Sequence, residues 1–332
     1  MRAVLFDHPG DESVLRVGEA EAPPIGPGHV RIRVATTAVN RADLLQRAGH
    51  YPPPAGASPI LGLECAGTVI ECGADASAFS PGDRVMALLP GGGYAEEAVV
   101  DAGSVMRVPA ALSDEEAGAL PEAFLTAYLN VFDLARARAG ETLLIHGGGG
   151  GVGTATTTLG KLAGLRVIVT AGSAEKCRRC VEHGADEAIN YKKDDFVRRV
   201  SDADVVLDHV GARYLTRDLQ VLRSGGRVVV IGGMGGTTMA SIDVGSLLAK
   251  RQQIIGSTLR ARPAAEKGEI VRGFLERFGP DLEAGRIRPV IHAVFPLEEA
   301  TEAHRLMKAS KHFGKLVLRI SGASGSTAPP RS

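Results

Sequence analysis

The pattern of hydrophobic and polar positions divides the chain into three stretches. In the first third, short apolar runs are broken by Pro- and Gly-rich segments such as PPIGPGH at 23–29 and LPGGG at 89–93. Short strands at this spacing are typical of a small β-barrel or β-sandwich. The predicted strands are Arg2–Phe6, Val30–Val34, Thr68–Cys72 and Arg84–Leu88, and one short helix is predicted over Ala42–Arg47.

The second stretch begins near residue 113. Ser113 and Glu116 have the spacing of a capping box, and a helical pattern continues from Phe124 to Ala137 beyond a break at Pro121. From residue 141 onward, apolar runs rich in β-branched residues alternate with helical segments. These runs lie at 143–146, 166–171, 187–190, 205–210 and 227–233. The alternation predicts parallel strands buried on both faces of a doubly wound α/β domain.

The third stretch returns to a mixed pattern. We expect helices over 269–278 and Leu297–Lys308, with strands over 287–296 and Lys315–Ile320. The sequence pattern therefore predicts a β-rich domain that is interrupted by an α/β domain. The predicted bounds are 1–123 for the first part of the β-rich domain, 124–264 for the α/β domain, 265–320 for the second part, and 321–332 for a flexible tail.

The sequence HGGGGGVG at 146–153 is the strongest local signal. Gly148, Gly150 and Gly153 satisfy the G-x-G-x-x-G spacing, between an apolar strand and a helix. Glycines at these positions let backbone N–H groups approach a pyrophosphate at the N-terminus of a helix. A flexible surface linker is the alternative, but a linker does not fit between two buried strands. We therefore expect a dinucleotide-binding loop.

The end of the next strand indicates which dinucleotide is bound. NAD-binding units usually place Asp or Glu there, whereas this strand ends in Thr-Ala-Gly-Ser at 170–173, with no acid before Glu175. The basic and hydroxyl-bearing residues nearby are Ser173, Lys176, Arg178, Arg179, Tyr191, Lys192 and Lys193. Such a pocket suits a 2′-phosphate and predicts NADP(H). The alternative is that these basic residues form a solvated helix face.

Composition narrows the choice of partners. The 332 residues include 38 Lys and Arg against 38 Asp and Glu, so net charge gives no attraction to nucleic acid or an anionic membrane. No apolar run approaches the roughly 20 residues of a membrane span, and the N-terminal residues do not match a signal peptide. We expect a cytoplasmic protein with a small-molecule substrate.

The four cysteines are Cys65, Cys72, Cys177 and Cys180. They are too few to hold a chain of this length together, so we expect reduced thiols and no disulfide framework. Cys65 and Cys72 have no neighbouring His, and Cys177-x-x-Cys180 resembles half of a zinc site but has no second pair. Cys177 and Cys180 share a helix face beside basic residues that could lower a thiol pKa, so a redox switch is an alternative to simple packing there.

Several segments together resemble the zinc-free NADPH:quinone oxidoreductase branch of the medium-chain dehydrogenase/reductase superfamily. They are AVNRADLLQRAGHYPPP (38–54), LGLECAGTV (61–69), GDRVMALLPGGGYAE (82–96), PEAFLTAY (121–128), LIHGGGGGVGTA (144–155), VTAGSAEKC (169–177), NYKKDDF (190–196) and HRLMKASKHFGKLVL (304–318). Zinc-dependent relatives carry Cys and Gly-His-Glu where this chain has Asn40 and Gly62-Leu63-Glu64. The resemblance therefore implies no metal.

The resemblance also implies a GroES-like barrel packed on a Rossmann domain, with NADPH in the cleft and a homodimer formed through edge strands near 254–259. The residues implied for the cofactor are Thr126, Gly148, Gly150, Gly151, Val152, Gly153, Ser173, Lys176, Tyr191, Gly232, Gly233, Met234 and Lys315. Tyr51 and Asn40 are implied as catalytic residues beside the nicotinamide. In this view Tyr51 offers a hydrogen bond or a proton to the developing oxyanion, whereas a ring packed on Pro52–Pro54 is its alternative role, and Asn40 also suits a helix N-cap.

The implied activity is hydride transfer from NADPH to quinones. A quinone accepts hydride readily, so the protein needs to orient the reactants and exclude water more than to activate a carbonyl with a metal. Two alternatives remain open at this point. One is an NADPH-dependent enal or enone reductase, and the other is a non-catalytic NADPH-binding redox sensor or structural protein.

Overall fold

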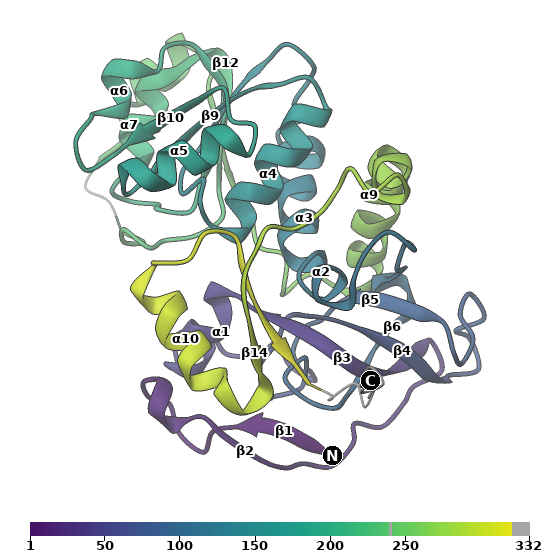
Figure 1. Cartoon of the computed structure of the whole chain (residues 1–332). Helices are drawn as coiled ribbons and strands as arrows, with labels where there is room; N and C mark the ends of the chain where they lie inside the picture. Colours follow the sequence, from purple (N-terminus) through teal and green to yellow (C-terminus); the bar gives the residue numbers. More distant parts are fainter. Residues whose placement is uncertain (239–240, 321–332) are drawn as a thin grey trace, which may run out of the picture.

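The computed structural model describes residues 1–238 and 241–320. Figure 1 shows two lobes, with the α/β lobe above and the β-rich lobe below. Helices α3 and α9 lie between them on one side of the molecule. The C-terminal segment with α10 and β14 lies in the β-rich lobe beside the N-terminal strands, so segments far apart in sequence build that lobe together.

The β-rich lobe is organised around the long strand β3. This strand pairs with β4 along one side and with β6 and then β15 along the other. The seven-stranded sheet has the order β14-β15-β3-β4-β5-β7, with β6 on β3, and β1 pairs with β2 separately. The strands of this lobe are β1 Arg2–Leu5, β2 Arg16–Glu19, β3 His29–Val39, β4 Glu64–Cys72, β5 Arg84–Leu88, β6 Glu97–Asp101, β7 Val105–Arg107, β14 Ile291–Pro296 and β15 Lys315–Arg319.

The second half of β3 departs from the predicted strand. The sequence pattern predicts Val30–Val34, but the strand continues to Val39. Residues 36–39 are all buried, so the alternation of buried and exposed positions that marks a strand is lost there. The remaining helices of this lobe are α1 Arg41–Arg47, α2 Asp114–Gly118 and α10 Ala300–Ala309, with short 3-10 turns at Glu12–Val14, Ala102–Ser104 and Leu297–Glu299.

The α/β lobe has the predicted doubly wound arrangement. Its strands are parallel in the order β10-β9-β8-β11-β12-β13, which is the 3-2-1-4-5-6 order of a Rossmann sheet. The strands are β8 Thr142–Ile145, β9 Arg166–Ala171, β10 Glu187–Asn190, β11 Ala203–Asp208, β12 Leu222–Val230 and β13 Gln253–Gly256. The helices are α4 Gly151–Leu162, α5 Ala174–Glu182, α6 Phe196–Arg199, α7 Leu215–Val221 and α8 Val244–Ala249. The chain order reverses between β8 and β11, where such sheets bind ligands.

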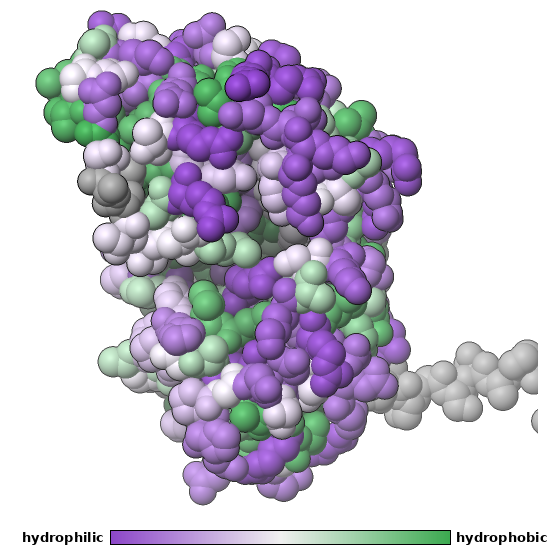
Figure 2. Space-filling model, turned by 90° about the vertical axis from the view of Figure 1, so that its left-hand side faces the viewer, coloured by the Kyte–Doolittle hydropathy of each residue, from purple (hydrophilic) through white to green (hydrophobic). Residues whose placement is uncertain are grey.

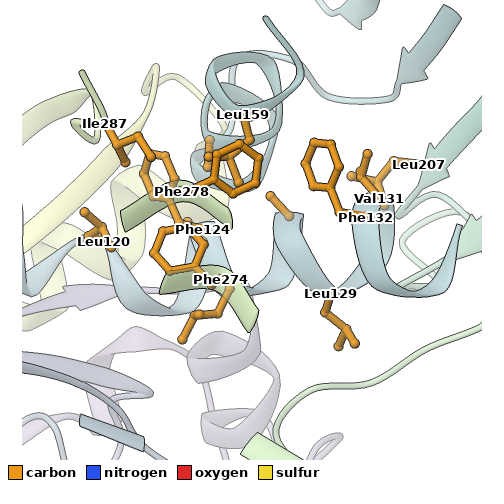
Figure 3. Packing of buried hydrophobic residues seen from close by; sticks show 14 of the residues in the cluster. Leu120, Phe124, Leu129, Val131, Phe132, Leu159, Leu207, Phe274, Phe278 and Ile287 are labelled. Atoms are coloured by element: carbon orange, nitrogen blue, oxygen red, sulfur yellow. The ribbon is translucent and has the colours of Figure 1, made fainter. Parts of the chain in front are cut away.

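One hydrophobic core runs through both lobes. It is centred on α3 Pro121–Tyr128, on the π-helical segment Leu129–Leu134 that continues it, and on α9 Ala264–Glu283. Figure 3 shows Phe124 of α3 and Phe132 of the π-helical segment packed among Phe274 and Phe278 of α9 and Leu159 of α4. The rings of Phe132 and Phe278 meet edge to face at 5.1 Å. This shared core fixes how the lobes sit against each other.

Within the described part of the chain, no helix is both long enough and apolar enough to span a bilayer. Cys65, Cys72, Cys177 and Cys180 are free thiols, as predicted. Cys65 and Cys180 are buried.

Replacing Phe278 by Ala should destabilise the protein by about 3–5 kcal/mol, because it leaves a cavity among the aromatic rings of the shared core. Leu275 on the same helix is 36% exposed, so Leu275→Ala is the matched control and should cost far less. Denaturant unfolding of both variants measures the difference. Equal losses would show that the two lobes do not depend on this aromatic cluster.

Candidate functional site

The glycine loop between β8 and α4 is closely packed, and individual glycines are required there. Gly147 has a φ of +70°, and a Cβ on it would lie 2.2 Å from the ring of His209. A Cβ on Gly148 would meet Val169 at 2.6 Å, and one on Gly153 would meet the carbonyl oxygen of Gly147 at 2.4 Å. The loop is therefore a fixed turn rather than a flexible linker.

The start of α4 has the form of an anion cradle. Gly150 stands at the N-cap and α4 begins at Gly151. A Cβ on Gly150 would have one neighbour, the Gly147 carbonyl at 3.5 Å, so this face of the loop is open. Open backbone N–H groups at a helix N-terminus favour a pyrophosphate. Gly148, Gly150, Gly151, Val152 and Gly153 make up this turn and the first residues of α4.

A buried polar cluster supports the loop from beneath. The Nε2 atom of His146 lies 2.8 Å from Oδ1 of Asp218, and its Nδ1 atom lies 3.1 Å from the hydroxyl of Thr170. Burial lowers the pKa of His146 to about 4 and raises that of Asp208, at the end of β11, to about 6. These contacts connect the end of β8 to β9 and to α7 below the loop.

The last strand of the β-rich lobe joins the glycine loop. The backbone N–H of Gly314 donates to the carbonyl of Gly149 at 2.9 Å, and Gly150 and Gly314 form a parallel bridge. The side chain of Lys315 lies over the loop, since a Cβ on Gly151 would come within 2.4 Å of its Cδ. The structure therefore brings Lys315 to the loop from the other lobe.

The residues predicted for a 2′-phosphate gather at the end of β9. Ser173 is the N-cap of α5, and its hydroxyl accepts from the backbone N–H of Lys176 at 3.1 Å. The Lys176 ammonium donates to the carbonyl of Ser310 at 2.7 Å, and burial lowers its pKa. Tyr191 lies against Gly172, where an added Cβ would be 2.7 Å from the phenol oxygen. Glu175 is exposed on the first turn of α5.

The turn after β12 reaches the same edge of the sheet. The backbone N–H of Met234 donates to the carbonyl of His209 at 3.1 Å, and a Cβ on Gly232 would lie 3.0 Å from that oxygen. Gly233 is exposed, and Met234 is 58% exposed. Since His209 also packs on Gly147, this turn and the glycine loop are neighbours.

A fully buried carboxylate organises the floor of the site. Glu64, at the start of β4, accepts from the Nδ2 atom of Asn40 at 2.8 Å and from the ammonium of Lys315 at 2.6 Å. The ammonium also donates to Oδ1 of Asn40 at 2.7 Å. The second oxygen of Glu64 accepts from the backbone N–H of Glu122 at 2.9 Å. Asn40 stands at the N-cap of α1, which is one of the two roles predicted for it.

Tyr51 lies beside a buried arginine rather than only against its prolines. The guanidinium of Arg260 is 5.4 Å from the centre of the Tyr51 ring. Arg260 is itself held by the carbonyl of Pro90 at 2.8 Å and by Oε1 of Gln46 at 2.6 Å. Burial raises the pKa of Tyr51, the charge of Glu122 raises it further, and Arg260 opposes both.

Helix α3 contributes Glu122 and, one turn later, the buried Thr126. The Oε2 atom of Glu122 is buried and makes no hydrogen bond among the described residues. Burial, together with the charge of Glu64, raises the pKa of Glu122 to about 8, although Lys315 and Lys267 act in the opposite direction. Lys267, from α9, is 6% exposed.

The His, Cys, Asp and Glu side chains are those that could bind a metal ion, and the cysteines could also react as thiols. Across residues 1–238 and 241–320, no three His, Cys, Asp or Glu side chains are grouped to hold a metal. Leu63, at the position where zinc-dependent relatives carry His, is buried and apolar. The lowered thiol pKa considered for Cys177 and Cys180 is wrong, because burial raises both values, that of Cys180 to about 12.

Four residues of the site were missed as candidates from the sequence: Glu64, Glu122, Arg260 and Lys267. The charges of Glu122 and Lys267 had a signal in the sequence. Glu122 follows Pro121 in a run that is otherwise almost apolar, which is an unusual place for a charge. Lys267 precedes Ile270, Val271 and Phe274 at helical spacing, so it shares their buried face. The signal in both cases is a charge at a core position. Figure 2 shows the surface drawn in between the two lobes.

Comparisons with known proteins agree with this architecture. The family model described as "Alcohol dehydrogenase GroES-like domain" matches residues 26–110, and the one described as "Zinc-binding dehydrogenase" matches residues 183–318. Quinone oxidoreductase of the mouse, Mus musculus, is 33% identical over 331 residues, which cover 96% of this chain and 98% of that protein.

Two solved structures extend the comparison. Escherichia coli quinone oxidoreductase complexed with NADPH has a TM-score of 0.83 at 26% identity, covering 96% of this chain and all of that one (100%). An NAD-dependent alcohol dehydrogenase also has a TM-score of 0.83, at 32% identity, covering 97% and 100%. The predicted GroES-like and Rossmann domains are confirmed. The chain therefore belongs to the medium-chain dehydrogenase/reductase superfamily, and its relatives over nearly its whole length include quinone oxidoreductases.

Proposed function

We propose that this protein is an NADPH-dependent quinone oxidoreductase that works without zinc. The observation that carries the proposal is the position of Lys315, which lies over the glycine loop at Gly151 and also binds Glu64 and Asn40 of the β-rich lobe. The quinone oxidoreductases among the relatives support the substrate class. With this function we propose a catalytic domain of residues 1–123 and 265–320 around an NADP-binding domain of residues 124–264.

The residues present fit NADPH. Gly148 and Gly150–Gly153 would lie against the pyrophosphate, with Lys315 above them. Ser173, Lys176 and Tyr191 would meet the 2′-phosphate, and Thr126, Gly232, Gly233 and Met234 would lie toward the nicotinamide. When bound, NADPH supplies the hydride. One similar structure is that of an NAD-dependent enzyme, and NAD has no 2′-phosphate. The residues proposed to bind the 2′-phosphate are therefore the ones to test.

The chain's own residues orient the substrate and exclude water. Asn40 is fixed by Glu64 and Lys315, so its amide forms a rigid wall of the pocket. Tyr51 would donate a hydrogen bond to the oxygen of the quinone as charge develops there. Leu63 offers no ligand to zinc, and a quinone needs none, because it accepts hydride readily. The barrier falls mainly through proximity and orientation.

We further propose a cytoplasmic homodimer. Strand β13 is the last strand of its sheet, and Ile254 on it is 37% exposed. An uncovered strand edge offers backbone N–H and C=O groups to a second copy. Pairing of two such edges would extend the sheet across both subunits.

The purified protein should oxidise NADPH rapidly when an ortho-quinone or a para-quinone is present, with NADH much slower, as followed at 340 nm. A chelator should leave the rate unchanged, because no step needs a metal. Turnover of an enal alone would favour the enal reductase, and NADPH binding without any turnover would favour the sensor or structural protein. Preference for NADH would contradict the assigned 2′-phosphate pocket.

Tyr51→Phe should lower kcat for quinones by about tenfold, since it removes one hydrogen bond to a developing charge. The Kd for NADPH should stay the same, as measured by fluorescence titration. Tyr128→Phe is the matched control, because its ring packs on Phe274 in the core shared by the two lobes. An unchanged kcat in Tyr51→Phe would leave Tyr51 with a packing role against Pro52–Pro54.

Lys176→Met should weaken NADPH binding by about tenfold and NADH binding far less, because it removes a cation that pairs with the 2′-phosphate. Lys308→Met, at an exposed position of α10 where the ammonium donates to Glu12, is the control and should change neither. Equal losses for both dinucleotides would instead assign Lys176 to the contact with Ser310 that joins the lobes.

A further inference from the structure

Glu122 is an ionisable group whose position the hydride transfer itself does not explain. Its backbone N–H donates to Glu64 at 2.9 Å, which fixes the first turn of α3. Thr126 follows four residues later on the same face of the helix. The Glu122 side chain thus lies one turn from the residue assigned to the nicotinamide. Its Oε2 atom is buried without a hydrogen-bond partner among the described residues, and such an atom in a folded protein calls for an explanation.

We propose that the carboxyl group of Glu122 is the acid that supplies the proton consumed when the substrate is reduced. The assignment rests on the quinone oxidoreductase function proposed above and names the residue that completes it. A quinone gains a hydride from the reduced dinucleotide and one proton from Glu122. Two electrons and two hydrogens convert it to the hydroquinone, and the carboxylate regains its proton from solvent.

Charged groups from every packed element face Glu122. Two of them are acidic, Glu64 of β4 and Asp43 of α1, and both favour the protonated carboxyl. Lys315 of β15 and Lys267 of α9 favour the carboxylate. Tyr51 and Arg260 complete the set, since each is coupled electrostatically to Glu122.

Burial decides the balance. It is the largest cause of the raised pKa of Glu122, and the charge of Glu64 adds to it, so the carboxyl holds its proton up to about pH 8. An acid is most effective when its pKa lies near the working pH. Tyr51, whose pKa is raised above its usual value of 10.0, is a hydrogen-bond donor but a weaker acid.

The first test is the pH profile of kcat/KM for a para-quinone with NADPH. In the wild-type protein the rate should fall as the pH rises through about 8, because the protonated fraction of Glu122 falls. Glu122→Gln should lower kcat by about tenfold or more and remove this alkaline limb. Glu276→Gln, at an exposed position of α9, is the control and should keep the limb.

A second variant should shift the pH at which kcat/KM falls while leaving Glu122 itself unchanged. Lys267 stabilises the carboxylate of Glu122, so Lys267→Met should raise the pKa of Glu122 and shift the limb to higher pH. A residue that merely holds the fold would not produce a directed shift. A limb that stays in place or moves to lower pH contradicts the assignment.

A measurement without cofactor or substrate gives an independent readout. The infrared difference spectrum of wild type minus Glu122→Gln should show a protonated carboxyl band that disappears around pH 8. A band already lost at the ordinary pKa of glutamate overturns the proposal. If Glu122→Gln still reduces quinones and its rate still falls above about pH 8, the assignment of Glu122 is wrong but the proposed function stands. If the wild-type protein reduces no acceptor, both the proposed function and the assignment are wrong.

Discussion

The buried charge of Glu64 is the constraint on which the site depends. A carboxylate with no exposed surface needs compensating partners, because desolvation of an unpaired charge costs several kcal/mol. Its partners come from three distant segments: Asn40 before α1, Lys315 on β15 and the backbone of Glu122 at the start of α3. Satisfying one carboxylate therefore fixes the positions of three elements, and those elements form the floor of the cleft.

The same contacts connect the two lobes. Lys315 reaches from Glu64 to the glycine loop, and Gly314 beside it is bonded to Gly149. The core around Phe124 and Phe278 joins the lobes on the other side of α3. A dinucleotide on the loop would thus lie against residues of both lobes, although the two lobes are built largely from separate parts of the sequence.

The parts of this structure that depend on local pattern were predictable. The strands at 166–171 and 187–190 have the predicted bounds, because buried parallel strands are short apolar runs. The glycine loop was predicted from its spacing. The partners of Glu64 and Arg260 were not, because Lys315 is 251 residues from Glu64 and Gln46 is 214 from Arg260. No local sequence pattern indicates a contact between residues so far apart in the chain. The end of β3 was missed because burial on both faces removes its alternation.

The charges of the floor also bear on the proposed zinc-free reaction. The floor holds Asn40, and Leu63 beside Glu64 is buried and apolar. The positive charge near the reaction comes from Lys315, Lys267 and Arg260, each largely buried. These side-chain cations can balance the negative charges of Glu64 and Asp43. They do not fully offset the cost of burying a third carboxylate, that of Glu122. Glu122 consequently keeps its proton near neutral pH. In the proposed zinc-free reaction, Glu122 would act as a Brønsted acid where a metal-dependent enzyme uses a Lewis acid.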